Sequence, residues 1–452
     1  MGLGYLLLAT KSEQDNYLVG NPQFTFFKQM YKKHTNFAID NMFLNFVGDT
    51  TNCYGRKLYM DVPKNADLLH KMYIAIDIES TGDISGCSPI AYSMIEYVEL
   101  FIGGQSMDKH PGEYLYLSHE LFQNKQKELA LADMVSTHRS GTKNTIYIPL
   151  RFWFNNDIGL SLPLIALQYA EVRVEIKFNN AATVQTYIKN NGFSVSQTVN
   201  IRRVQLLAEY IHLDNEERRL FSSNSHEYLI TQLQYSFRNP IQLFITDSDS
   251  LYEKIQHRVD LRFNHPVKEL LWTVQDSHGR LYDTSNNGLQ GNLYNYEPLG
   301  VFHYNYWRNF KSGVDHILGA NIVLNGKDMT EELPANFYRS VQQYQYHNGF
   351  GVNYIRDLAS SLDKTYPSYN PSYGSGVYSY SFSIKPEEHQ PSGSLNFSKL
   401  EKAQLKFRIA RDTVNFTNGG SNNITYKTMN IYAINYNVVR IESNLAGLAF
   451  TN

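Results

Sequence analysis

The chain has 452 residues, which is enough for two or three domains of ordinary size. Its 34 Tyr and 25 Phe favour the half-buried surfaces of β-sheets over helices. The 41 basic and 43 acidic residues give a net charge of −2 without a long block of like charge, so the composition does not support nucleic acid or an anionic membrane as the direct partner.

The first ten residues, MGLGYLLLAT, are apolar but do not have the pattern of a secretory signal. They lack a basic leading region, and Lys11, Glu13 and Asp15 interrupt the apolar run. A myristoylation site needs Ser or Thr where this chain has Leu6. Nothing in the sequence approaches the roughly 20 apolar residues of a membrane-spanning helix. We therefore expect a folded, soluble protein that is not secreted by the usual route.

Residues 21–40, NPQFTFFKQMYKKHTNFAID, combine aromatic and basic side chains and contain no catalytic signature. The simplest interpretation is that at least two of Phe24, Phe26, Phe27 and Phe37 are ordinary core residues.

The chain has two cysteines, Cys53 and Cys87, which are too few for a disulfide framework in a chain of this size. We interpret both as reduced, buried thiols. This fits assembly inside a cell.

Alternation of apolar and polar residues dominates the rest of the chain. In VRVEIKF, residues 172–178, apolar and charged side chains alternate strictly, as a strand with one wet face requires. AQLKFRI at 403–409 repeats this pattern. Further strands, separated by Gly, Asn, Pro and Ser, are expected at MYIAIDI (72–78), VELFI (98–102), HRVDLRF (257–263), NIVLN (321–325) and YSYSFSI (378–384).

Two helices are expected. One covers about residues 118–134, and the other starts after Asp214, a suitable N-cap that is followed three residues later by Glu217. The second helix lies near the midpoint of the chain, within residues 213–230. We interpret it as the hinge between two domains.

Two segments in the two halves of the chain resemble each other. LFIGGQSMDK at 100–109 and IVLNGKDMTE at 322–331 each have alternating apolar residues, a glycine turn and then a methionine, at an offset of 222 residues (100 to 322). The alternating strands at 172–178 and 403–409 come after them in the same order. This repetition indicates a duplicated β-domain with loop insertions. Residues 364–378, KTYPSYNPSYGSGVY, are predicted to form an exposed loop.

No usable catalytic motif is present. His-Glu pairs at 119–120 and 226–227 begin like the zinc motif HExxH, but Gln123 and Ile230 stand where the second histidine is needed. The histidines show no metal-ligand spacing.

Other chemical signals are weak. Gly326 and Lys327 lack the remaining residues of a phosphate-binding loop. Asp247 and Asp249 have the chemistry for a divalent cation, although a solvated turn is the simpler interpretation. Paired carboxylates of the glycosidase type stay open, because such residues need not be neighbours in sequence. We predict no enzyme activity, no metal site and no cofactor.

Three N-x-S/T sequons are candidate glycan acceptors, at Asn396, Asn415 and Asn423. Asn370 is excluded because Pro371 comes directly after it. Without a secretory signal, we do not expect modification by the usual route.

Long segments resemble the major capsid proteins of large icosahedral (nucleocytoplasmic) double-stranded DNA viruses, a family that includes the iridovirus and phycodnavirus capsid proteins. The most specific are PLRFWF with GLSLPLIALQY, within 149–169, and KPEEHQPSG at 385–393. The resemblance also includes residues 21–40, ELFIGGQSMDKHPGEYL, IYIPLRFWFNNDIGLSLPLIALQYAEVRV, YIHLDNEERRLF, HEYLI, FNHPVKELLW, IVLNGKDM, YSFSIKPEEHQPSGSLNFSKL and the terminal NYNVVRIESNLAGLAF. These segments occur in the family's order over nearly the whole chain.

The resemblance implies an all-β double jelly roll, that is, two consecutive eight-stranded antiparallel barrels or sandwiches with a few short helices. It divides the chain into an N-terminal segment (1–24), a first jelly roll (25–213), an inter-domain helix or hinge (214–230) and a second jelly roll (231–452). The N-terminal segment is expected on the inner side of the capsomer, with residues 1–30 ordering only on assembly.

The implied function is that of a structural subunit of a viral capsid, which assembles as a homotrimeric, pseudo-hexagonal capsomer. Neighbouring capsomers and minor capsid proteins are the implied partners. Lys28, Lys32 and Lys33 are expected to face minor capsid proteins or an internal viral membrane. The protein is expected in the virion shell after assembly in the host cytoplasm, with no direct contact to nucleic acid.

Two alternatives stay open. A paralogous minor capsid or scaffold protein would have the same fold, and abundance in purified particles would distinguish it. A carbohydrate-binding or carbohydrate-cleaving β-sandwich would explain the many aromatic residues by stacking on sugars.

Overall fold

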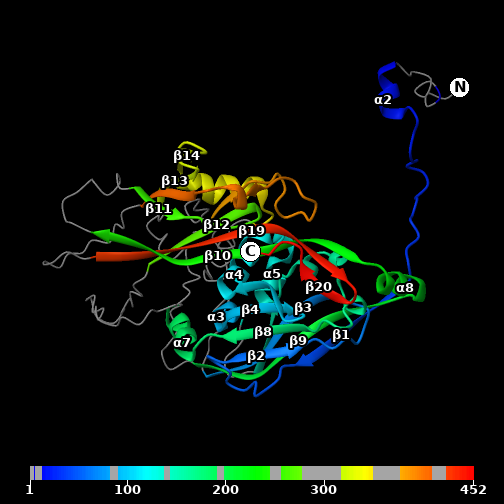
Figure 1. The fold of residues 1–452 in the computed structure, drawn as a ribbon, viewed down its shortest axis with the longest axis horizontal. Coiled ribbons are helices and arrows are strands. Elements are labelled where there is room, and N and C mark those ends of the chain that lie inside the picture. Colours follow the sequence, from blue (N-terminus) through cyan, green and yellow to red (C-terminus); the bar gives the residue numbers. More distant parts are fainter. Residues whose placement is uncertain are drawn as a thin grey trace. The chain divides into compact units, whose positions relative to one another are not determined.

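The computed structural model describes Tyr5 and residues 13–81, 90–136, 143–190, 198–244, 256–276, 317–349, 377–409 and 424–451 (Figure 1). The chain divides into two compact units, Met1–Phe37 and Ala38–Asn452. Each unit is described by itself.

The N-terminal unit contains a short 3₁₀ turn, η1 (Glu13–Asp15), and one turn of helix, α2 (Asn16–Val19). The four phenylalanines expected to supply core residues are all exposed, from 48% at Phe37 to 98% at Phe27. The core prediction is therefore wrong for this segment. The physical reason is that one turn of helix has no second layer against which to bury a face.

The first half of the larger unit forms two sheets. Sheet A has the order β1 (Phe37–Asn45), β9 (Thr198–Leu213), β3 (Leu68–Thr81) and β6 (Lys143–Pro149), with β7 (Leu162–Pro163) paired to β3. Sheet B has the order β2 (Lys57–Asp61), β8 (Val172–Phe178), β4 (Ile95–Ile102) and β5 (Gln105–Pro111). The helical segments of this first half are α3 (Ile90–Met94), α4 (Gly112–Phe122), α5 (Lys125–Met134), α6 (Trp153–Asn156), η2 (Ile158–Leu160), η3 (Leu164–Ala166) and α7 (Ala181–Asn190).

The helix α8 (Asn215–Ser223) leads to the second half, which forms two more sheets. Sheet C has the order β10 (His226–Phe244), β19 (Ile424–Glu442), β12 (Pro266–Asp276) and β16 (Val377–Ser381), with β17 (Leu395–Asn396) on β12 and β20 (Leu445–Leu448) on β19. Sheet D has the order β11 (Gln256–Asp260), β18 (Ala403–Ile409), β13 (Ile317–Leu324) and β14 (Lys327–Asp328), with β15 (Leu333–Pro334) on β13. The helical segments of this second half after α8 are η6 (Phe337–Val341), α9 (Gln342–Tyr346) and η7 (Phe397–Lys399).

The two halves have the same topology. In chain order, β1, β3, β6 and β9 of sheet A correspond to β10, β12, β16 and β19 of sheet C, and the sheet orders are identical. Sheets B and D correspond in the same way. Each pair of antiparallel sheets, with four corresponding strands in each sheet, is a jelly roll, so the predicted all-β double jelly roll is confirmed.

The repeated sequence segments are the same hairpin in both halves. They form β4–β5 and β13–β14, and each hairpin turns at a glycine with φ of +80°, Gly104 and Gly326. Gly103 and Asn325 before them also have positive φ. Positive φ at both central residues is the requirement of a tight type I′ hairpin turn, which explains why the sequence repeats there.

The predicted elements agree best where alternation is strict, since VRVEIKF and AQLKFRI are β8 and β18 from end to end. The helix expected near the midpoint is α8, and Asp214 is its N-cap. The single helix predicted over 118–134 is wrong, because α4 ends at Phe122 and α5 begins at Lys125. The Asn124 side chain accepts a hydrogen bond from the backbone N–H of Gln126 at 3.1 Å, which caps a new helix there.

The middle of sheet C, where β12 and β19 pair, is buried on both faces. Leu270, Trp272 and Val274 of β12 point into the core of the second jelly roll, whereas Leu271 belongs to the core cluster of the first half. Figure 1 shows α4 and α5 between the long strands β10 and β19 and the strands of the first jelly roll. The two jelly rolls therefore share one packed junction, which lies on the outer face of sheet C.

Candidate functional site at the junction of the two jelly rolls

The junction is formed by the segment that leaves β5 and enters α4. Gly112 starts this helix, and a Cβ atom there would lie only 2.2 Å from the carbonyl oxygen of Ile95. The close approach excludes every other residue unless the backbone moves. It places the next residue, Glu113, against sheet C.

Glu113 is a fully buried carboxylate that links the two jelly rolls. One oxygen accepts a hydrogen bond from the Thr273 hydroxyl at 2.9 Å, and the other accepts from the Asn430 side-chain amide at 2.8 Å. These partners lie on β12 and β19. Because a buried carboxylate without donors is very costly, this arrangement fixes the position of α4 on sheet C.

A second buried carboxylate, Asp108 on β5, makes a similar link. Its Oδ1 accepts from the backbone N–H of Leu233 on β10 at 3.1 Å, and its Oδ2 lies 2.9 Å from Nε2 of His110. The His110 ring stacks on Phe152, with 4.8 Å between centroids. The edge of the first jelly roll is thereby attached to the first strand of the second.

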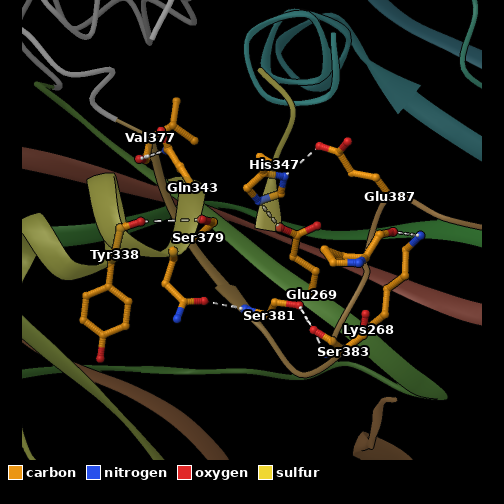
Figure 2. A network of polar contacts seen from close by, with 12 residues as sticks. Lys268, Glu269, Tyr338, Gln343, His347, Val377, Ser379, Ser381, Ser383 and Glu387 are labelled. Carbon is orange, nitrogen blue, oxygen red and sulfur yellow. Dashed lines mark hydrogen bonds and ion pairs between the residues drawn. The ribbon is translucent and has the colours of Figure 1, made fainter. Parts of the chain in front are cut away.

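The third part of the junction is a buried cluster of charged groups (Figure 2). His347 lies just after α9, and its Nε2 lies 2.6 Å from Oε1 of Glu269 on β12, while its Nδ1 lies 3.2 Å from Oε1 of Glu387. The side chains of His347 and Glu269 are both 1% exposed. The neighbouring Lys268 donates to the carbonyl oxygen of Pro386 at 2.6 Å.

The cluster shifts the proton affinities of its cations in opposite directions. Burial favours neutral imidazole, but the carboxylates of Glu269 and Glu387 outweigh it and raise the pKa of His347 to about 9. Burial lowers the pKa of Lys268 to about 8, against the attraction of the same carboxylates. At neutral pH these pKa values leave both His347 and Lys268 mainly protonated.

This cluster also touches the first jelly roll. The His347 ring lies against Phe122 of α4, with 5.5 Å between centroids, and the backbone N–H of Gly349 donates to the carbonyl oxygen of Leu121 at 2.8 Å. The chain after α9 is consequently held between β12 and α4.

Hydrogen bonds attach η6 and α9 to β16 beside the cluster (Figure 2). The Gln343 side chain donates to the carbonyl oxygen of Val377 at 2.8 Å, and the backbone N–H of Ser381 donates to the Gln342 side chain at 3.1 Å. Gln342 and Gln343 are buried, so this helical segment is mounted rigidly on sheet C.

The structure describes one of the three candidate glycan acceptors. Asn396 is exposed at the end of β17, and its side chain accepts from the backbone N–H of Ser398 at 3.0 Å. Asn415 and Asn423 lie outside the described residues. The Asp247–Asp249 turn and residues 364–376 of the expected loop also lie outside them.

The histidines that resembled a metal motif have other partners. His119 Nδ1 lies 3.1 Å from the Tyr92 hydroxyl, and His226 Nε2 lies 2.8 Å from the carbonyl oxygen of Phe221. Within the described ranges, no group of three or more metal-ligating side chains comes together. Cys53 is a buried free thiol whose pKa burial raises to about 11, and Cys87 falls in a range that is not described.

The residues of the junction were not identified from the sequence. One signal was available: Lys268 and Glu269 interrupt the otherwise apolar stretch PVKELLWTV, and both are buried. Charged residues inside such a run indicate either a solvent face or a paired buried site. Their partners His347 and Glu387 are too distant in sequence for any spacing rule.

Comparison with known proteins divides the chain into the same two halves. A family model described as the major capsid protein N-terminus matches residues 25–214, and one described as the large eukaryotic DNA virus major capsid protein matches residues 217–447. The chain belongs to the major capsid protein family of large eukaryotic DNA viruses. The resemblance stated from the sequence is thereby confirmed.

Individual members of the major capsid protein family match along their whole length. The major capsid protein of Pyramimonas orientalis virus is 32% identical and that of Paramecium bursaria Chlorella virus 1 is 31% identical, each with 100% of both chains covered. A quasi-atomic model of the PBCV-1 virus capsid superposes with a TM-score of 0.71 at 28% identity, covering 95% of this chain and 100% of the other. The Faustovirus major capsid protein shares the fold, with a TM-score of 0.62 at 9% identity and coverage of 96% and 94%.

Among the residues that can be described, none of the helices is both long enough and apolar enough to cross a membrane.

Proposed function

We propose that this chain is the shell-forming subunit of a virion and that three copies assemble into a pseudo-hexagonal capsomer. The observation that carries the proposal is the pair of jelly rolls with identical strand order in a chain of the major capsid protein family. Three such chains around a threefold axis supply six similar units, which gives a nearly hexagonal outline. Tiles of this shape pack side by side through repeated contacts.

The proposal includes the division into an N-terminal segment (1–24), a first jelly roll (25–213), a hinge (214–230) and a second jelly roll (231–452). It is supported by α8, which separates β9 from β10. The buried junction between the two jelly rolls then sets the angle between them, and a fixed angle is what a regular capsomer needs.

Residues 21–40, which begin at the end of the N-terminal segment, have the composition for partners on the inner side of the shell. Lys28, Lys32 and Lys33 accompany the exposed Phe26 and Phe27. We assign this segment to contacts with minor capsid proteins or an internal viral membrane, with assembly in the host cytoplasm. The capsomer has no catalytic role and no direct contact with nucleic acid in this proposal.

The first test is the mass of the purified protein, measured by light scattering after size exclusion. Three chains of 52.1 kDa give about 156 kDa, which is the expected result. Obligate interfaces commonly bury more than about 2,000 Å², so we expect the isolated monomer to be poorly soluble or absent. A stable monomer at all concentrations would contradict the autonomous capsomer. Low abundance in purified particles would favour a minor capsid paralogue, and binding on a glycan array would favour the carbohydrate alternative.

A further inference from the structure

The two jelly rolls differ in what covers the outer face of their equivalent sheets. Strands β3 and β9 of sheet A can be superposed on the equivalent strands β12 and β19 of sheet C by matching one cross-strand residue pair whose side chains face the core. In each sheet, the next cross-strand pair then faces outward. The inward pairs are Met72–Ala208 and Leu270–Ala433, and the outward pairs are Tyr73–Leu207 and Leu271–Tyr432. Leu271 and Tyr432 of sheet C are fully buried, whereas Tyr73 and Leu207 of sheet A are partly exposed.

The cover of sheet C is α4 of the first jelly roll. The Tyr114 ring lies 6.1 Å from that of Tyr432, beside the bonds of Glu113. In the chain, α4 stands between β5 and β6. The second jelly roll has η6 and α9 at the equivalent position, between β14 and β16. In the first jelly roll, the helix at this position covers sheet C of the other jelly roll. By analogy, η6 and α9 of the second jelly roll are suited to cover the equivalent sheet of a first jelly roll, which is sheet A.

Strand β1 extends the open face of sheet A with apolar side chains. Asn45 accepts a hydrogen bond from the outward-facing Gln205 at 2.8 Å, which places Asn45 on the outer side. Alternation then puts Phe43 and Ile39 on the same side. Phe43 is 52% exposed, and β1 is an edge strand of sheet A. An apolar edge strand that is exposed in this way favours association with another protein surface.

The helical segment of the second jelly roll carries matching exposed groups. Val341 ends η6 and Tyr344 lies on α9, where Tyr344 is 81% exposed. An exposed aromatic residue on a rigidly mounted helix is typical of an interface anchor. No described residue of this chain's larger unit covers it.

We propose that the outer face of sheet A is the docking surface for η6 and α9 of a second copy of this chain. The face consists of Ile39, Phe43, Tyr73 and Leu207, and it receives Val341 and Tyr344. This inference rests on the proposed trimer and specifies which surfaces form it. The contact between copies repeats the contact between jelly rolls within a copy. It is head-to-tail, so each copy offers one surface of each kind and three copies close a ring.

Two substitutions on opposite surfaces test the inference. Phe43→Asp changes the face, and Tyr344→Asp changes the helical segment. Each is expected to raise the concentration at which the trimer half-dissociates by at least about 30-fold, the effect of losing an interface anchor. Tyr169→Asp is the matched control, since Tyr169 is 76% exposed elsewhere and its replacement should leave the trimer unchanged. Circular dichroism of each variant confirms that its strands are formed.

Cross-linking tests the pairing directly. One subunit carries Phe43→Cys and the other Tyr344→Cys, both with Cys87 replaced by Ala, and Cys53 is buried. A flexible bismaleimide is expected to join the two subunits when they are mixed and reassembled. Subunits with Phe43→Cys alone should not be joined to each other, because the contact is head-to-tail.

The outcomes separate this inference from the trimer itself. A wild-type monomer contradicts the proposed function and removes both. A wild-type trimer that both Asp variants leave intact overturns the docking surface and keeps the trimer. If deletion of residues 13–36 abolishes hydrogen-exchange protection of β1 while the trimer persists, the face belongs to the chain's own N-terminal segment and the inference is overturned.

Discussion

Two buried polar sites at the junction of the jelly rolls depend on different chemistry. At one, the Glu113 carboxylate is held by neutral donors, Thr273 and Asn430. At the other, His347 lies between two carboxylates, with a buried lysine beside it. The first contact depends on the geometry of its donors. The second depends on the protonation of His347 and Lys268, so it is expected to change within the range of pH values that proteins commonly meet.

The difference shows how a junction can be specific without being an apolar surface alone. Leu271 and Tyr432 supply apolar contact on the outer face of sheet C, which any similar apolar face could satisfy. The buried polar groups accept only partners at the correct positions, because an unmatched charge in this place is strongly unfavourable.

The largest effect is expected from removing the carboxylate at the centre of the junction. Glu113→Ala leaves the Thr273 hydroxyl and the Asn430 amide without that acceptor and creates a cavity. We expect a loss of about 3–5 kcal/mol in the free energy of unfolding, measured by urea denaturation at fixed protein concentration. Glu216→Ala, at an exposed position on α8, is the control and should change it by less than about 0.5 kcal/mol. Equal effects of both changes would contradict a structural role for Glu113.

The next effect is the pH dependence of the charged cluster. The pKa of His347 is raised from 6.5 to about 9 in the folded protein. Its contribution to the free energy of unfolding is therefore complete below pH 6.5 and is lost as the pH rises toward 9. The pKa of Lys268 is lowered from 10.5 to about 8, so between these pH values the unfolded chain binds a proton that the folded protein has lost. The contribution of Lys268 to the free energy of unfolding therefore rises between about pH 8 and 10.5. Together they predict a fall of about 2 kcal/mol between pH 6.5 and 8, and then a minimum between pH 8 and 9.

Urea midpoints measured from pH 6 to 10 test this profile. His347→Gln should remove the fall between pH 6.5 and 8, because the glutamine side chain does not titrate. A fall that persists unchanged in this variant would assign the pH dependence to other groups.

A smaller and more selective effect is expected at Lys268. Lys268→Met keeps the length of the side chain but removes one of two cations that face Glu269 and Glu387. We expect a loss of about 1–2 kcal/mol at pH 7, since a buried carboxylate pair is less well compensated. The recovery of stability above pH 9 should disappear, while the fall below pH 8 stays. A variant at least as stable as wild type at pH 7 would show that the charge of Lys268 and its hydrogen bond to Pro386 do not offset the cost of burying it.

Elements with a strong local pattern could be predicted from the sequence, whereas contacts between distant residues could not. β8 and β18 were located because each has one wet face, which imposes strict alternation. The hairpins at Gly104 and Gly326 were located because their turns demand positive φ. The break at Asn124 was missed, since an N-cap inside a helical pattern gives only a weak signal.

The junction itself could not be found in this way. Glu113 and Asn430 are 317 positions apart, and no periodicity connects them. Burial of β12 on both faces replaces alternation by a continuous apolar run, so the pattern does not show which side chains face the other jelly roll. The N-terminal phenylalanines illustrate the opposite error: their composition resembles a core, but no surrounding elements enclose them.

The smallest effect separates buried from exposed ion pairs on the same sheet. Arg440 of β19 and Glu227 of β10 pair across the strands with 2.7 Å between Nε and Oε1, but their side chains are 60% and 63% exposed. Because water and salt screen this pair, Arg440→Gln should cost less than about 1 kcal/mol. Even that cost should shrink in about 1 M salt, where screening acts over a few ångströms. The loss in Lys268→Met should persist in the same salt, because ions do not enter a buried cluster. If the two variants respond alike to salt, the cluster around His347 is accessible to solvent, and the difference drawn between the two kinds of contact does not hold.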